Sequence, residues 1–144
     1  MNKMFTINAT DVRKDWSRTI DMAVREKPVF INRTRDDLIL ADTNTLVELL
    51  NVYSFTAQKY VEDDGSITLS LNEIDLIENA KNESDAKLLL AESIIEYAGE
   101  FYNNFALWSS APNRKKHIPY ILKALILEDA VRIGALIICQ TGEN

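Results

Sequence analysis

The sequence has almost none of the residues that disulfides, metal sites and nucleophilic enzymes use. Among 144 residues, Cys139 is the only cysteine and His117 the only histidine. A single cysteine excludes an intrachain disulfide, and no Cys/His spacing typical of a zinc site is present. A catalytic triad or a Cys–His pair would have to use His117, which we expect on a surface loop in the segment RKKHIP. We therefore predict a non-enzymatic protein with no catalytic residues, no metal and no cofactor.

Long apolar runs are also missing. No run approaches the 18 residues that a transmembrane helix needs, and the first residues lack the charged and then apolar pattern of a secretory signal. Hydrophobic residues make up 47% of the chain, with only four glycines and three prolines, which is too apolar for a disordered protein. We expect a soluble, cytoplasmic protein that makes no contact with a membrane and folds without disulfides.

The net charge of −6 is unevenly distributed along the chain. Residues 1–35 carry eight Lys or Arg and four acids, whereas residues 36–144 carry eight bases and eighteen acids. A basic N-terminal segment before an acidic remainder is typical of a protein with two kinds of partner, one of them nucleic acid. The alternative is the ordinary variation of charge along any chain, and charge alone does not decide between the two.

The first 53 residues show the order β-α-β-β-α. MFTI predicts a short strand, and Asn8 or Thr10 is placed to cap the helix that follows. PVFINR and DLILAD predict two strands around the turn TRDD, and Asp42 or Thr43 is placed to cap a second helix. The first helix carries an apolar stripe, which we expect in the core: Val12, Trp16, Ile20, Ala23 and Val24.

Residues 55–144 are predicted to form a second domain, so that the whole chain is α+β. FTAQKYV and ITLSL flank the hairpin turn EDDGS, in which Gly65 supplies a positive φ, and IDLIENA predicts a third strand. Ser84 is placed to cap a long helix that runs to about Asn104, followed by the basic loop SSAPNRKKHIP and two apolar helical segments, YILKALILEDA and VRIGALII. The long helix has a broad apolar face: Leu88, Ala91, Ile94, Ile95, Ala98, Phe101, Tyr102 and Phe105.

Five basic residues near the first helix and the first strand turn are the candidate DNA-binding site. Arg13 and Lys14 lie in the opening turns of the predicted helix, and Arg18 follows on the same face as Lys14. A helix N-terminus offers free N–H groups and a positive dipole end to phosphate, and arginine binds phosphate or guanine through two hydrogen bonds. The alternative is that these side chains are solvated and paired with nearby acids. The candidates are Arg13, Lys14, Arg18, Arg33 and Arg35; the acids are Asp11, Asp15 and Asp36.

A second candidate anion site is the tripeptide Arg114-Lys115-Lys116. Three consecutive cations attract phosphate, but a solvated loop is the simpler interpretation. Cys139 is expected to be a small residue of the core or the tail and not a nucleophile.

Residues 4–50 resemble the bacterial prevent-host-death (Phd/YefM) antitoxins of type II toxin–antitoxin systems. Thr10-Asp11-Val12-Arg13 stands where that family has SEAR, and Trp16 stands at its leucine. PVFINR is similar to the family's PIxITR, which places Arg33 at the family's arginine, and LILADTNTLVELL is similar to AVLMSLEEYxxL. The turn TRDD replaces a turn in which glycine is common.

The resemblance implies an antitoxin that dimerises through its β-α-β-β-α domain, residues 1–53, into a homodimer or a higher even oligomer. It implies repression of the protein's own operon through operator DNA, with Arg13 and Arg33 at the family's DNA-contacting positions. Lys14, Arg18 and Arg35 are added by charge and placement. The C-terminal part is implied to hold a cognate toxin.

The layout of residues 55–104 is similar, more distantly, to a HicB-type antitoxin half. Residues 55–144 carry eight bases and fourteen acids, a balance that suits a basic ribonuclease toxin. The alternative function is a non-enzymatic interaction or structural module that keeps the Phd fold only for dimerisation. Such a module would form a dimer without a salt-sensitive affinity for DNA.

Overall fold

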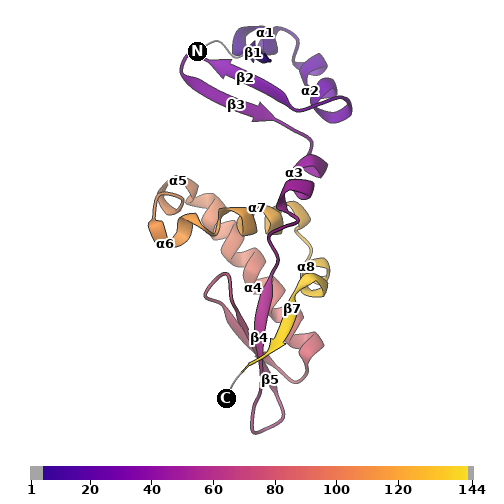
Figure 1. The fold of residues 1–144 in the computed structure, drawn as a ribbon, viewed down its shortest axis with the longest axis vertical. Coiled ribbons are helices and arrows are strands. Elements are labelled where there is room, and N and C mark those ends of the chain that lie inside the picture. Colours follow the sequence, from indigo (N-terminus) through magenta and orange to yellow (C-terminus); the bar gives the residue numbers. More distant parts are fainter. Residues whose placement is uncertain (1–4, 143–144) are drawn as a thin grey trace. The chain divides into compact units, whose positions relative to one another are not determined.

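The structure is a computed structural model that describes residues 5–142. It divides into two compact units, residues 1–49 and residues 50–144, which we call the N-terminal and C-terminal units. Each unit combines helices with its own sheet, so the fold class is α+β, as predicted (Figure 1). No helix within residues 5–142 is both long and apolar enough to cross a bilayer.

The N-terminal unit is a three-stranded sheet with two helices against one face (Figure 1). Its strands are β1 (Thr6–Asn8), β2 (Val29–Arg33) and β3 (Asp36–Leu40), and its helices are α1 (Ala9–Lys14), α2 (Trp16–Arg25) and α3 (Thr43–Leu50), whose last residue belongs to the C-terminal unit. The central strand β2 pairs in parallel with β1 and antiparallel with β3. Met4, part of the predicted first strand, lies outside the described residues.

Asp15 divides the predicted first helix into α1 and α2. Its φ of −136° and ψ of 64° are not helical, and its side chain accepts a hydrogen bond from the backbone N–H of Arg18 at 3.3 Å, so it caps α2. After this break, Thr19 and Ala23 form the buried side of α2. Trp16 and Val24, predicted in the core, are instead 53% and 52% exposed. The predicted stripe was wrong at these positions, because the buried side of α2 is centred on Thr19 and Ala23 and does not reach the first residue of the helix or Val24.

The core of the N-terminal unit lies between α1, α2 and one face of β2. The side chains of Val29 and Ile31 point to this face because alternate residues of a strand share a side. Val12 and Ala23 cover them from the two helices. The neighbouring Phe30 therefore points to the opposite face, which we call the outer face, beside its register partners Thr6 and Ile39.

The hairpin between β2 and β3 is confirmed, with a two-residue turn at Thr34 and Arg35. The register pairs Arg33 with Asp36 across the strands. Thr34 has a φ of +56°, a backbone region that glycine tolerates and a β-branched residue disfavours. The turn therefore keeps the geometry of a glycine-containing hairpin with a threonine in the strained position.

The C-terminal unit contains a four-stranded sheet in the order β6-β5-β4-β7. The strands are β4 (Thr56–Val61), β5 (Ile67–Leu71), β6 (Ile77–Ala80) and β7 (Ile138–Thr141). The predicted β4–β5 hairpin is confirmed: Gly65 has a φ of +85°, and the side chain of Asp64 accepts a hydrogen bond from the backbone of Ser66 at 2.9 Å. The last predicted helix ended at Ile138, the first residue of β7, and residues 139–141 were assigned to no element. The segment is a strand because it pairs in parallel with the open edge of β4.

The long helix α4 (Glu83–Asn103) packs across this sheet and supplies much of the core. Ser84 was predicted to cap this helix, but the cap is Asn82, whose side chain accepts a hydrogen bond from the Asp85 backbone N–H at 2.8 Å. Leu88 and Tyr102, expected on the buried face, are 38% and 64% exposed. The buried residues of α4 are Ala86, Leu90, Ala91, Ile94, Ala98 and Phe101.

The predicted basic loop, residues 109–119, is partly helical. It is preceded by α5 (Phe105–Trp108) and contains α6 (Pro112–Lys115). Its last two residues begin α7 (Ile118–Leu127), which is followed by α8 (Ala130–Leu136). Pro112 and Pro119 stand in the first positions of α6 and α7, where a missing backbone N–H costs no hydrogen bond. α7 and α8 pack on α4, and their residues Ile121, Ala124 and Ile133 are fully buried.

Candidate nucleic-acid interface

The start of α1 and the β2–β3 turn lie at the same end of the N-terminal sheet. Asn8, the last residue of β1, pairs in parallel with Asn32, so the chain enters α1 beside the last residue of β2. The side chain of Asn8 accepts hydrogen bonds from the backbone N–H groups of Thr10 at 2.9 Å and Asp11 at 3.3 Å, which confirms it as the helix cap. Arg33 and Arg35 follow directly in the β2–β3 turn.

Arg33 and Arg35 differ in their ion pairing within residues 5–142. The guanidinium of Arg33 lies 2.7 Å from the carboxylate of Asp36, its cross-strand register partner, and both side chains are exposed. A solvent-exposed ion pair contributes only about 0–1 kcal/mol, so a phosphate can replace the carboxylate at small cost. Arg35 is exposed and has no ion pair with any acid in the part of the chain that the structure describes.

Arg13, Lys14 and Arg18 are exposed and uncompensated within residues 5–142. Asp15, proposed above as their ion-pair partner, uses its carboxylate to cap the backbone of α2. The predicted geometry is corrected in two respects. Arg13 and Lys14 lie in the last turn of α1, not the first. The non-helical residue between Lys14 and Arg18 also removes the simple i,i+4 relation that was expected to place them on one face.

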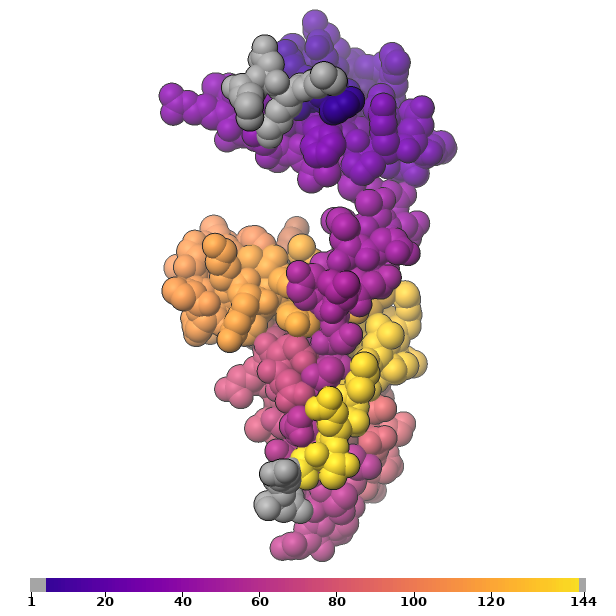
Figure 2. Space-filling model, in the orientation of Figure 1, coloured from indigo at the N-terminus to yellow at the C-terminus, as the bar shows by residue number. Residues whose placement is uncertain are grey.

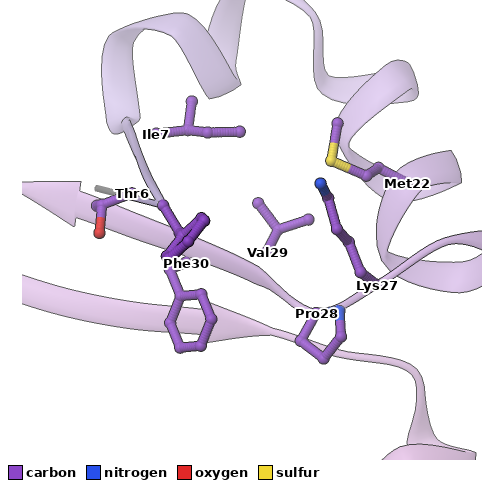
Figure 3. A pocket seen from close by; sticks show the side chains of 8 residues that line it. Thr6, Ile7, Met22, Lys27, Pro28, Val29 and Phe30 are labelled. Carbon is purple, nitrogen blue, oxygen red and sulfur yellow. The ribbon is translucent and has the colours of Figure 1, made fainter. Parts of the chain in front are cut away.

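The N-terminal unit also contains a largely apolar cavity of about 490 Å³. It is bounded by the starts of β1 and β2 and by the end of α2, and Figure 3 shows Val29 at its centre between Ile7 and Met22. Lys27 contributes the one charged side chain among the described residues of its wall. The remaining lining residues are Phe5, Thr6, Pro28 and Phe30.

Large apolar side chains are exposed around this cavity and on the outer face. Phe5 and Phe30 line the cavity and are 79% and 48% exposed, and Ile39 beside Phe30 is 57% exposed. Exposed aromatic and aliphatic side chains that adjoin one another are typical of a protein–protein interface.

His117 does not lie on an open loop as expected. It is half-buried immediately before α7, and its Nδ1 is 2.9 Å from the Tyr97 hydroxyl oxygen. Burial lowers the pKa of His117 below 6.5, and the positive charges of Lys116 and Arg114 lower it further. Among the described residues, the ring of Tyr97 meets the His117 ring edge to face, and the neighbouring charges are those of Lys116 and Arg114.

Cys139 is half-buried in β7 and packs against the core of the C-terminal unit. Burial raises the pKa of its thiol, so the thiol form predominates at neutral pH. Within residues 5–142, no three His, Cys, Asp or Glu side chains are grouped to hold a metal ion.

Residues 1–139 match the PHD_like family, described as "Antitoxin of toxin-antitoxin, RelE / RelB, TA system". A crystal structure of the antitoxin part of a proposed toxin/antitoxin system from Syntrophomonas wolfei subsp. wolfei is 36% identical in sequence. The match covers 96% of this chain and 100% of that one, with a TM-score of 0.91. No curated protein matches the chain.

Proposed function

This chain belongs to the PHD_like family of toxin–antitoxin antitoxins, and we propose that it neutralises a protein toxin and represses its own operon by binding operator DNA. The observation that carries the DNA-binding part is the set of exposed cations on the N-terminal unit, of which Arg13, Lys14 and Arg18 have no acidic partner within residues 5–142. Cations without such partners gain most from contact with phosphate, because no ion pair has to be broken first.

We propose that the N-terminal unit is of the Phd/YefM type, on the sequence resemblance that aligns Arg13 and Arg33 with that type's DNA-contacting positions. Arg33 ends β2 and Arg35 lies in the turn that follows, both beside the entry to α1, and Arg13 and Lys14 stand at the end of that short helix. Arg18 extends the basic surface onto α2. A β-hairpin turn and a neighbouring helix present two groups of cations, which suits contact with a duplex backbone and adjoining bases.

The acidic C-terminal unit is the proposed binding region for the toxin. The family description names RelE together with RelB, and we propose a toxin of the RelE type, basic in charge, as the partner. Residues 50–144 carry fourteen acids against eight bases, which gives the charge complementarity that such a toxin requires. The protein would act without catalysis, by occupying the toxin, in the cytoplasm where its operon is transcribed.

We further propose that the N-terminal unit forms a homodimer through its exposed apolar surface. The outer face presents Phe30 and Ile39, and the adjoining cavity presents Phe5. A dimer places two copies of the basic surface on one DNA duplex, which suits a two-fold symmetric operator.

A fluorescence titration against the DNA upstream of the gene tests the repressor proposal. We expect specific binding that weakens steeply between a low and a high salt concentration. Equal affinity for upstream and random DNA would reject operator recognition and favour the alternative of a dimerisation module. The toxin proposal is tested separately by co-expression with the neighbouring gene's product: persistent toxicity would reject it.

A further inference from the structure

The acidic C-terminal unit contains one basic region. Residues 101–127 hold four Lys or Arg and no acid, whereas the other residues of the unit hold four bases and fourteen acids. Three of the four bases are consecutive, Arg114, Lys115 and Lys116, at the end of α6. α5 and α6, coloured orange in Figure 1, lie at one side of the unit, and the same orange surface bulges outward in Figure 2. We call residues 105–117 the α5–α6 lobe.

The first residue of the basic tripeptide is anchored to the hydrophobic core. The guanidinium carbon of Arg114 lies 3.8 Å from the centre of the Trp108 ring, a cation–π contact. Trp108 in turn stacks on Tyr97 of α4, with ring centres 5.8 Å apart and planes inclined by 28°, and meets Phe101 edge to face. The chain at Arg114 is therefore attached to α4 through two aromatic rings.

The residue that follows the tripeptide is anchored to the same ring system. The Nδ1 of His117 is 2.9 Å from the hydroxyl oxygen of Tyr97. Lys115 and Lys116 lie between these two anchors, and both side chains are exposed. No acid within residues 5–142 forms an ion pair with either lysine. The backbone at the tripeptide is thus ordered before any partner arrives, which reduces the entropy lost on binding.

We propose that the α5–α6 lobe contacts the phosphate backbone of duplex DNA through Lys115 and Lys116, with Arg114 beside them. This is a second DNA contact, carried by the C-terminal unit, and it rests on the proposed function of DNA binding. Cations that meet phosphates add affinity without adding sequence information.

The packing of Trp108 favours duplex DNA over a single strand. Binding of single-stranded nucleic acid relies on exposed aromatic rings on which successive bases stack. The Trp108 ring already contacts Arg114 and Tyr97, so it is engaged within the protein. The exposed side chains of the lobe include Lys115, Lys116 and Leu107 but no aromatic ring, and its two lysines fit the regular phosphate array of a duplex.

The charge pattern of the unit also separates two partners of opposite sign. The proposed toxin is basic and is attracted to the acidic remainder of the unit, whereas the basic lobe repels it. A polyanion such as DNA is attracted to the basic lobe and repelled by the acidic remainder of the unit. The lobe therefore leaves the acidic surface available to the toxin while DNA is bound.

The test compares three full-length double variants with the wild type on duplex DNA that contains the upstream site. Lys115→Gln/Lys116→Gln removes two charges from the lobe. Lys81→Gln/Arg132→Gln removes two charges from exposed positions of the same unit outside the lobe and serves as the matched control. Lys115→Arg/Lys116→Arg keeps both charges. The measured quantity is the slope of log affinity against log salt concentration, and unfolding curves establish that each variant is folded.

We expect the glutamine variant of the lobe to reduce the slope by about 1 to 2, since each phosphate contact contributes about 0.9. The control pair and the arginine pair should keep the wild-type slope. If the glutamine variant binds DNA with the wild-type slope, the inference is overturned while the repressor proposal stands. A loss confined to single-stranded RNA would overturn it in favour of an RNA contact. Wild-type protein that binds no DNA at any salt concentration would refute both.

Discussion

The imidazole of His117 and the phenol of Tyr97 meet at 2.9 Å, where α7 begins against the middle of α4. The contact joins residues twenty positions apart and lies beside the stacked Trp108 and Arg114. His117, the only histidine of the chain, was expected on a surface loop. It is instead part of the packing that holds the α5–α6 lobe to α4.

The burial of His117 beside two cations makes stability depend on pH. The pKa of His117 lies below 6.5 in the folded protein, first because of burial and then because of Lys116 and Arg114. The unfolded chain therefore binds the proton more tightly, and the free energy of unfolding should decrease as pH falls from 6.5 through the lower folded-state value. Urea unfolding at about pH 7.5 and about pH 5.5 measures the decrease. His117→Gln should lose it, whereas Tyr97→Phe, which keeps the burial, should retain it. An equal decrease in His117→Gln would assign the effect to other groups.

Arg13→Ala and Arg33→Ala should each weaken operator binding. Loss of a base contact costs about 1–3 kcal/mol, and loss of a phosphate contact chiefly lowers the salt slope. Arg33 also leaves its ion pair with Asp36 when it binds DNA, so its net loss should be the smaller of the two. Arg25→Ala, which removes an exposed arginine paired with Asp21 at 2.7 Å, is the control within the same unit. Unchanged affinity in both test variants would reject their assignment to the interface.

Phe30→Ser/Ile39→Ser should weaken self-association at least about tenfold, because burial of one large apolar side chain contributes about 1.5–3 kcal/mol. Both residues lie on the outer face and not in the core of the N-terminal unit, so the monomer should remain folded. Sedimentation equilibrium measures the dimer dissociation constant. Val61→Ser, at an exposed position of the C-terminal unit, should leave it unchanged. A dimer of wild-type strength in the double variant would place the interface elsewhere.

Asn82→Ala should destabilise the C-terminal unit by about 1 kcal/mol, because its side chain caps α4. Ser84→Ala is the matched control: it removes a polar side chain from the first turn of the same helix and should change the free energy of unfolding by less than about 0.5 kcal/mol. Denaturant unfolding of the two variants compares them directly. A larger loss of stability in Ser84→Ala than in Asn82→Ala would show that Ser84 is the cap.

Thr34→Gly should stabilise the N-terminal unit by a few tenths of a kcal/mol to about 1 kcal/mol. A β-branched residue at a φ of +56° carries a steric cost of about 1–2 kcal/mol, which the greater flexibility of glycine in the unfolded chain partly offsets. Thr34→Val keeps the strain and should give no gain. Thermal unfolding of both variants is the measurement, and a loss of stability in Thr34→Gly would show that the threonine is favourable at this turn.

The sequence carries its strongest information where local chemistry decides the structure. The β4–β5 hairpin follows from Asp64-Gly65 between alternating strands, and the cap of α1 follows from Asn8 before a helical pattern. A tight turn needs a residue with a positive φ, and a helix start needs a side-chain acceptor for its free N–H groups. Residues close in the chain supply both. The antitoxin family is likewise visible in an ordered set of short motifs.

Other features depend on which segments meet after folding. β7 is a strand because β4 has an open edge, and Ile138–Thr141 has no local signal that separates it from the preceding helix. Trp16 belongs to the predicted apolar stripe but is exposed, because it is the first residue of α2 and the packed part of that helix is at Thr19 and Ala23.

The five cations of the candidate interface could be chosen from the sequence by charge and by family position. Whether each cation has an acidic partner could not be read from the sequence. The ion pair of Arg33 with Asp36 comes from the cross-strand register. Because the carboxylate of Asp15 caps α2, the cations Arg13, Lys14 and Arg18 have no acidic partner within residues 5–142. In the same way the sequence alone shows three consecutive cations at residues 114–116, and only the tertiary structure attaches them to α4 through Trp108 and Tyr97. Charge and local propensity are properties of the chain, whereas ion pairing, burial and ring stacking depend on distances that exist only after distant segments have packed.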